Sequence, residues 1–287
     1  MSKYYYLIAG LPNISLDDVK IPFSLSELRN GLDDILTNTD KVFINLFFHK
    51  FDNKNLITQL SKLDSNTDKI GSLNFEELQE LIVAVKEDEN LSNKKIATYL
   101  IEFIRIYFDA QEIDEKTVIS WEDRLAAMYY DYSIKCSNKF IAEWFELNLN
   151  INNIITAITC RKYGLERADY IVGSNEIAQS LRTSNARDFG IGDSVEYLPE
   201  IQRIAEETDL LAREKKTDLL KWLWLDENTF FKTFDIESVF AYLVRLEMME
   251  RWITLDKTAG EKTFRELIGA MKTGSNEALE EFKRNNK

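Results

Sequence analysis

The segment from Phe234 to Gly260 carries the clearest alternation of apolar and polar positions in this chain. Its apolar residues recur at steps of mostly three and four, which places them on one face of a helix. They are Ile236, Val239, Phe240, Leu243, Leu246, Met249 and Ile253, and charged residues stand between them at Arg245, Glu247, Glu250 and Arg251. The pattern predicts a long packed helix over residues 235–258, without an evident catalytic group.

Helical periodicity extends over most of the remaining chain. We expect further helices at residues 24–37, 40–63, 74–87, 92–110, 115–147, 150–163, 174–184, 196–226 and 261–284. Ser24, Asn74 and Ser120 each stand three positions before an acidic residue, which is typical of a helix start. The expected helix ends are at Gly31, Gly71, Gly164 and Gly260.

Residues that favour turns are scarce. The chain has three prolines and ten glycines, and residues 72–163 contain neither type. A β-rich fold of this size would need many more turn residues, so we predict an all-α fold. Residues 4–9 are expected to be helical or irregular, and linkers are expected at 64–73 and 187–195, where glycine and small polar residues combine.

Net charge narrows the set of partners. The 287-residue chain is 45% hydrophobic and has a formal net charge of −13. Nucleic-acid binding is not expected, because no basic cluster is present, and direct insertion into an anionic membrane surface is disfavoured. With no signal peptide and no long apolar run, the sequence predicts a cytoplasmic, soluble protein suited to a basic partner surface.

Few residues are candidates for chemistry. Cys136 and Cys160 are read as buried thiols rather than a disulfide framework. The only histidine, His49, lies in an apolar run, and we interpret it as a partly buried, satisfied side chain. No cofactor or metal site is predicted. The pairs Asp17-Asp18 and Asp33-Asp34 lack the third aspartate of the diphosphate motifs of helical prenyl-transfer enzymes, so a helical enzyme is a distant alternative.

Two aromatic runs stand out. Trp222 and Trp224 are expected in the core of a helical bundle. Tyr4, Tyr5 and Tyr6 are consecutive, and three such rings cannot all face one core from a helix. We therefore treat these tyrosines as candidate interface aromatics, with packing against another helix of the same chain as the alternative.

The charges near the end of the 234–260 segment allow two interpretations. Glu247 and Arg251 are four residues apart with the acid first, which favours an ion pair on one helix face. Their neighbours are nearly all apolar, however, and a helix that is apolar nearly all round is surrounded by protein. Glu247, Glu250 and Arg251 could then line an internal groove for a partner.

These residues also carry a resemblance. The run from Phe240 to Glu247, followed by Glu250 and Arg251, resembles the C-terminal signature of the central-stalk C subunits of V-type and archaeal-type rotary ATPases, called d in the eukaryotic V-ATPase. The stretch from Leu147 to Gly164 is similar to that family's internal copy of the signature.

The N-terminus has a related resemblance. Its Lys3–Ala9 segment resembles the opening of the same family, although residues 10–12 stand where the family carries arginines. The string from Tyr4 to Asp18 is also similar to an uncharacterised bacterial family whose members are typically encoded among V-type ATPase subunits. We interpret both resemblances as one, to a divergent bacterial version of the central-stalk C subunits.

The resemblance implies a funnel of about three similar helical sub-bundles, roughly residues 1–70, 71–190 and 191–287. It implies a non-catalytic protein that links the rotor shaft to the membrane ion-translocating ring and transmits torque. Such a protein would be peripheral on the cytoplasmic face of the cell membrane and would meet the membrane only through the ring. The alternative is a free-standing acidic α-helical adaptor, which would not co-purify with stalk and ring subunits.

Overall fold

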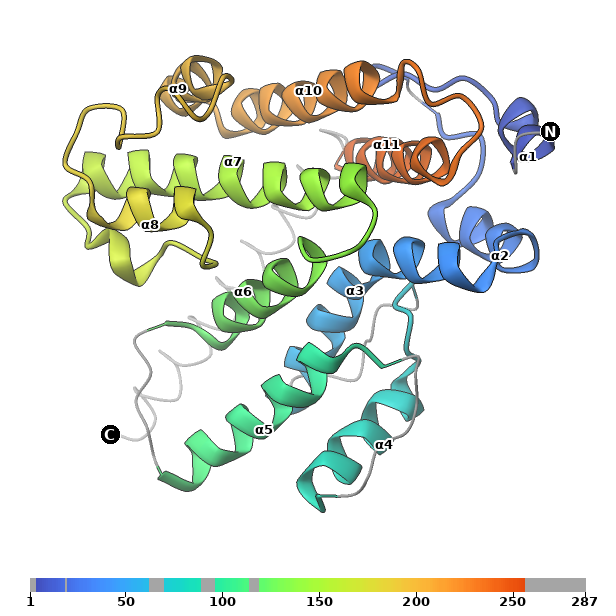
Figure 1. Ribbon diagram of the computed structural model, residues 1–287, viewed down its shortest axis with the longest axis horizontal. Coiled ribbons are helices and arrows are strands. Elements are labelled where there is room, and N and C mark those ends of the chain that lie inside the picture. The colour runs from blue at the N-terminus through green and yellow to red at the C-terminus, as the bar shows by residue number, and fades with distance from the viewer. Residues whose placement is uncertain (1–3, 19, 62–69, 89–95, 114–118, 256–287) are drawn as a thin grey trace, which may run out of the picture.

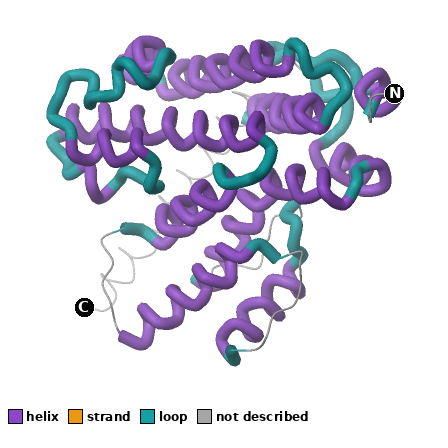
Figure 2. The backbone as a smooth tube through the Cα atoms, viewed as in Figure 1, coloured by secondary structure: helices purple, strands orange, loops and turns teal. Residues whose placement is uncertain are grey.

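The computed structural model describes residues 4–18, 20–61, 70–88, 96–113 and 119–255. Within these ranges every regular element is helical, which confirms the predicted all-α class (Figure 1, Figure 2). The elements are α1 (Tyr5–Gly10), α2 (Leu25–Ile35), α3 (Asn38–Leu60), α4 (Phe75–Lys86), α5 (Thr98–Ile113), α6 (Trp121–Ser133), α7 (Lys139–Tyr163), a 3-10 turn (Arg167–Asp169), α8 (Glu176–Thr183), α9 (Leu198–Glu206), α10 (Leu210–Thr229) and α11 (Ile236–Thr254).

Helix α11 is largely enclosed by other helices. It packs against α2, α3, α7 and α10, whereas α3, α4, α5 and α6 pack against one another and α8 and α9 lie on α7 (Figure 1). Ten of its residues are buried, from Ile236 to Met249. Most of the buried apolar side chains form one continuous core, with members from Tyr4 to Met249. The funnel and its three sub-bundles stay a prediction, and α11 contacts helices from all three proposed sub-bundles.

The predicted helix starts have the expected chemistry. Ser24 and Asn74 each form a reciprocal capping box with the glutamate three residues later, and Ser120 accepts a hydrogen bond from the backbone of Asp123. Gly164 ends α7 in the left-handed conformation at φ 67°. Gly31 was wrong as a helix end, since it lies inside α2.

The expected helix break near residues 147–150 is also wrong. Helix α7 runs without interruption from Lys139 to Tyr163, and the break lies earlier, where Asn138 caps α7. Two asparagines inside this continuous helix bond to the segment that follows it. Asn153 forms two hydrogen bonds with the backbone of Val172, at 2.7 and 3.0 Å, and Asn150 accepts one from Asn175.

The helix expected over residues 196–226 is two helices. Helix α9 ends at Glu206, and Asp209 begins α10 by accepting hydrogen bonds from Leu211 and Ala212. Aspartate is a strong N-cap residue because its carboxylate satisfies free backbone N–H groups. The side chain of Trp222 is buried in the core, as predicted, and Trp224 stacks on Phe140 with ring centroids 5.4 Å apart.

Several other expectations can be placed. Residues 187–195 form the predicted linker, with Phe189 and Gly190 at positive φ. The expected helix 261–284, the end at Gly260 and residues 64–69 of the other linker lie outside the described residues. In the part of the chain that the structure describes, no helix combines the length and apolar character needed to cross a membrane.

Candidate functional site

The three charged residues singled out in α11 each reach a different helix. Glu247 Oε1 lies 2.9 Å from the ammonium of Lys50 in α3. Glu250 accepts a hydrogen bond of 3.0 Å from the backbone N–H of Leu25, the first residue of α2. The guanidinium of Arg251 donates to Asp218 in α10. These side chains therefore tie the central helix to three of its neighbours.

The ion pair expected between Glu247 and Arg251 is replaced by longer-range pairs. In the described ranges the acid pairs with Lys50 and the arginine pairs with Asp218, with Glu214 at 4.0 Å from its other terminal nitrogen. An ion pair four residues apart on an exposed helix contributes only about 0.3–0.5 kcal/mol to stability. Ion pairs with residues of neighbouring packed helices can therefore replace it. A role for these charges in a partner groove stays a prediction.

Asp218 is the buried centre of this ionic cluster. Its side chain is 4% exposed, and its carboxylate accepts from Arg251 and from the indole N–H of Trp252 at 2.7 Å. Sequence patterns did not single out Asp218 or Lys50. Both residues occupy positions that helical spacing assigns to a packed face. A charged residue at such a position is rarely buried without a partner, and this was the only sequence signal that could have found them.

A cavity of about 210 Å³ lies beside the cluster. Its lining comes from α3, α6, α7, α10 and α11, with the residues Phe47, Lys50, Tyr129, Tyr130, Trp144, Phe145, Asn148, Asp218, Lys221, Glu247, Met248 and Arg251. Burial lowers the pKa of both Lys50 and Lys221, and nearby carboxylates oppose that shift only in part. Lys50 and Lys221 are both half-buried, so the site holds partly desolvated cations next to aromatic walls.

A second feature is a set of exposed aromatic rings, Tyr5 and Tyr6 on α1 and Phe230 and Phe231 in the α10–α11 loop, which we call the aromatic corner because Tyr5 packs on Phe234 of the same loop. Tyr5 packs on Tyr6 and on Phe234, at centroid distances of 5.5 and 4.8 Å. Tyr6 is 78% exposed, and Phe231 is 91% exposed. Figure 1 shows α1 beside the loop that joins α10 to α11.

Tyr4 does not belong to this surface. Its side chain is 3% exposed and its hydroxyl donates to Asp40, so the placement of Tyr4 among the interface aromatics is corrected. The backbone N–H of Tyr4 also donates to the carbonyl of Phe234 at 3.3 Å. The tyrosine run therefore divides, with one ring in the core and two outside, because consecutive residues of a helical turn point in different directions.

The remaining candidates for chemistry are engaged locally. His49 is buried, with Nδ1 3.0 Å from Asp52 and 3.2 Å from Ser72, which confirms a satisfied core histidine. Cys160 is buried and Cys136 is half-buried, and both thiols are free. In the described ranges, no group of three or more histidine, cysteine or acidic side chains is placed to hold a metal ion.

A family model described as "Protein of unknown function (DUF2764)" matches residues 1–275. The chain belongs to this family. No curated protein and no solved structure matches the chain. The family match spans α1 to α11, so the ionic cluster and the aromatic corner both lie within the family's matched region.

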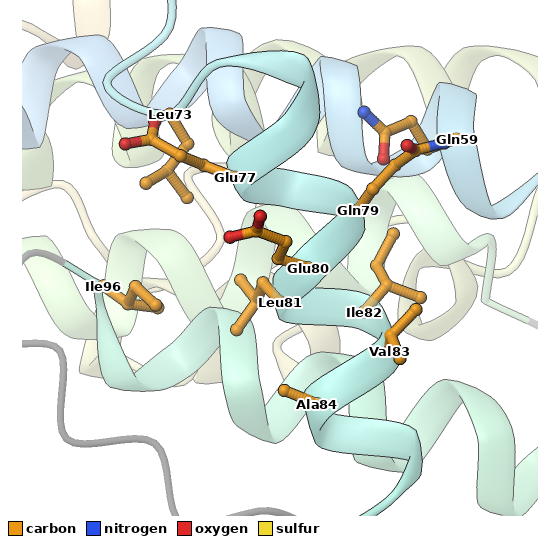
Figure 3. A pocket seen from close by; sticks show the side chains of 10 residues that line it. All are labelled: Gln59, Leu73, Glu77, Gln79, Glu80, Leu81, Ile82, Val83, Ala84 and Ile96. Carbon is orange, nitrogen blue, oxygen red and sulfur yellow. The ribbon is translucent and has the colours of Figure 1, made fainter.

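A larger hollow of about 890 Å³ lies along α4. Figure 3 shows Gln79, Ile82 and Val83 projecting from one side of this helix, and Glu77 and Glu80 from the other. Glu77 is already used in the capping box of α4. None of the described residues that line this hollow is basic, so it offers apolar and acidic surface without the charge variety of the cavity beside α11.

Proposed function

We propose that this protein is a non-catalytic central-stalk subunit of a V-type ATPase or ATP synthase. In this role it links the rotor shaft to the membrane ion-translocating ring and transmits torque between them. It stands at the cytoplasmic face of the cell membrane and meets the bilayer only through the ring. The proposal rests on the resemblance of residues 240–251 to the signature of the central-stalk C subunits, together with the way those residues are used in the fold.

The observation that carries the proposal is the bracing of α11. Glu247, Glu250 and Arg251, which the resemblance selects, connect this helix to α3, α2 and α10. A protein that transmits torque has to resist shear between its helices, and packed helices with cross-linking ion pairs and hydrogen bonds form a stiff body. Glu247, Glu250 and Arg251 thus make the helical body stiff. A stiff body is what a subunit needs in order to pass torque from one bound partner to another.

The aromatic corner supplies a surface for a protein partner. Tyr and Phe are enriched in the centres of protein interfaces, where they give large buried areas. Phe230 and Phe231 follow directly on the last turn of α10, and they are 73% and 91% exposed. The net charge of −13 adds a preference for a basic surface.

Affinity purification from the native membrane tests this proposal. A tagged full-length chain should recover the shaft and ring subunits, with one copy of the chain per complex. Replacing Phe231 by Ser should weaken the recovery while leaving the fold intact, because an exposed side chain contributes little to stability. Val83→Ser, which changes a residue that is 53% exposed on the distant helix α4, is the matched control.

The alternative, a free-standing acidic adaptor, is favoured by the same aromatic corner, because exposed aromatic rings suit many partners. The purification separates the two proposals. Recovery of the chain from the soluble fraction, without shaft or ring subunits, would reject the stalk assignment and favour the adaptor.

A further inference from the structure

The cavity beside α11 has a charge balance opposite to that of the whole protein. The chain has 49 acidic and 36 basic residues. Among the cavity-lining residues, however, three are cations and two are carboxylates. The cations are Lys50, Lys221 and Arg251, and the carboxylates are Asp218 and Glu247. The cavity lining therefore carries one excess positive charge.

Lys221 carries that excess charge. Lys50 pairs with Glu247 and Arg251 pairs with Asp218. Across the described chain, no carboxylate lies within ion-pair distance of the Lys221 ammonium, although Asp218 precedes it by one turn of α10. Lys221 is half-buried, and even a partly desolvated cation is less stable without a carboxylate partner than with one.

Other groups in the cluster also have unused capacity to donate hydrogen bonds. The Nε of Arg251 is buried and has no hydrogen-bond partner among the described residues. Burial lowers the pKa of Lys221, and the nearby carboxylates do not restore it. Glu214, 4.0 Å from Arg251, is half exposed and does not line the cavity. The cluster therefore has more donors than its own carboxylates use.

The walls restrict the kind of anion that fits. Rings from Phe47, Tyr129, Trp144 and Phe145 line the cavity. The lining residues lie within helices, whose backbone N–H groups are already used, so the site lacks the row of free amides that typically cradles phosphate. One excess cation matches a monoanion, and aromatic walls favour an organic one.

The volume sets the size of the ligand. At 210 Å³ the cavity is smaller than the ~300–1,000 Å³ of drug-sized pockets. It corresponds to roughly seven water molecules at about 30 Å³ each. Such a space suits a small free molecule better than a peptide segment.

We propose that this cavity binds a small organic carboxylate, whose charge pairs with Lys221 and whose apolar part lies against the aromatic walls. The inference is independent of the proposed role in a rotary ATPase, because torque transmission requires no ligand in this cavity. If the membrane purification recovers no stalk subunits, the proposed function is rejected but the proposal for this cavity still stands.

Thermal unfolding of the purified full-length chain tests the proposal. The probes are sodium acetate and sodium benzoate, titrated against sodium chloride at equal ionic strength, with sodium phosphate in a parallel series. We expect at least one carboxylate to raise Tm with a saturable dependence on concentration. Lys221→Met should weaken the apparent affinity at least tenfold, and Lys221→Arg should keep it within a few fold.

Lys215→Met is the matched control, because Lys215 lies on the same helix, is 55% exposed and pairs with Asp17 outside the cavity. This variant should respond to carboxylate as the unchanged chain does. Lys221→Gln replaces Lys221→Met if the latter loses its helical circular dichroism. Equal responses in the unchanged chain and the Lys221 variant, or a response to phosphate alone, would overturn the assignment.

Discussion

Asp218→Ala should be among the most damaging single changes to a charged residue. The carboxylate of Asp218 accepts hydrogen bonds from Arg251 and from Trp252, and its side chain is 4% exposed. Its removal leaves a guanidinium and an indole N–H without their acceptor.

The magnitude follows from burial. Breaking a fully buried ion pair from one side costs about 3–5 kcal/mol. Arg251 is 39% exposed, so water can partly solvate the orphaned guanidinium. We therefore expect a loss of about 2–3 kcal/mol in the free energy of unfolding, in the range of hydrogen bonds to charged groups.

Urea denaturation followed by circular dichroism measures this loss. Glu214→Ala is the matched control on the same helix, since Glu214 is 53% exposed and 4.0 Å from Arg251, and it should cost at most about 0.5 kcal/mol. A double variant, Asp218→Leu with Arg251→Met, should recover much of the loss, because an apolar pair avoids desolvating charge. If Asp218→Ala costs no more than Glu214→Ala, the ionic cluster does not brace α11.

Three further predictions concern other parts of the fold. Gly173→Ala should destabilise the protein by about 1 kcal/mol or more in denaturant unfolding, because φ is 80° and the added Cβ would lie 2.9 Å from Leu149. Gly31→Ala is the control, and it should be neutral or stabilising because its added Cβ meets nothing within 4 Å. Equal effects of the two substitutions would contradict this prediction. Asn153→Ala should cost about 2 kcal/mol by the same assay, because it removes both hydrogen bonds to the 172 backbone, and an unchanged midpoint would argue against them. Burial raises the pKa of Tyr130 to about 12, so the contribution of this group to the free energy of unfolding is present below pH 10 and is lost as pH rises through 12. Tyr130→Phe should therefore flatten the dependence of the free energy of unfolding on pH between 10 and 12. The same pH dependence in both proteins would refute the raised pKa.

The fold class could be predicted because its causes are local. The scarcity of glycine and proline, the helical spacing of apolar residues and the capping boxes at Ser24 and Asn74 all act within a few residues. The continuity of α7 could not be predicted in this way. Asn153 lies inside α7, where its side chain bonds to the backbone of Val172, nineteen residues away, and a contact at that separation leaves no local signal.

At the candidate site, too, the local features could be predicted and the long-range contacts could not. Glu247, Glu250 and Arg251 were found from their placement in an apolar helix. Their partners could not be found, because helical spacing predicts neighbours three or four residues away. The actual partner of Arg251 is 33 residues away, and that of Glu250 is 225 residues away. Lys221 carried no signal, since an unpaired lysine in a cavity looks like any other lysine in a helix.

The hydrogen bond between Glu250 and Leu25 has a consequence for synthesis of the chain. The first helices reach their native contacts only when residues near the C-terminal end of the described chain are available, and Tyr4 likewise bonds to Phe234. During translation, α1 and α2 therefore leave the ribosome long before α11 is made, and the apolar surface that they bury against α11 and its neighbours stays exposed until then. We expect nascent chains that stop before Phe234 to depend on chaperones, and α11 to bring α1 and α2 into their native contacts in a late step.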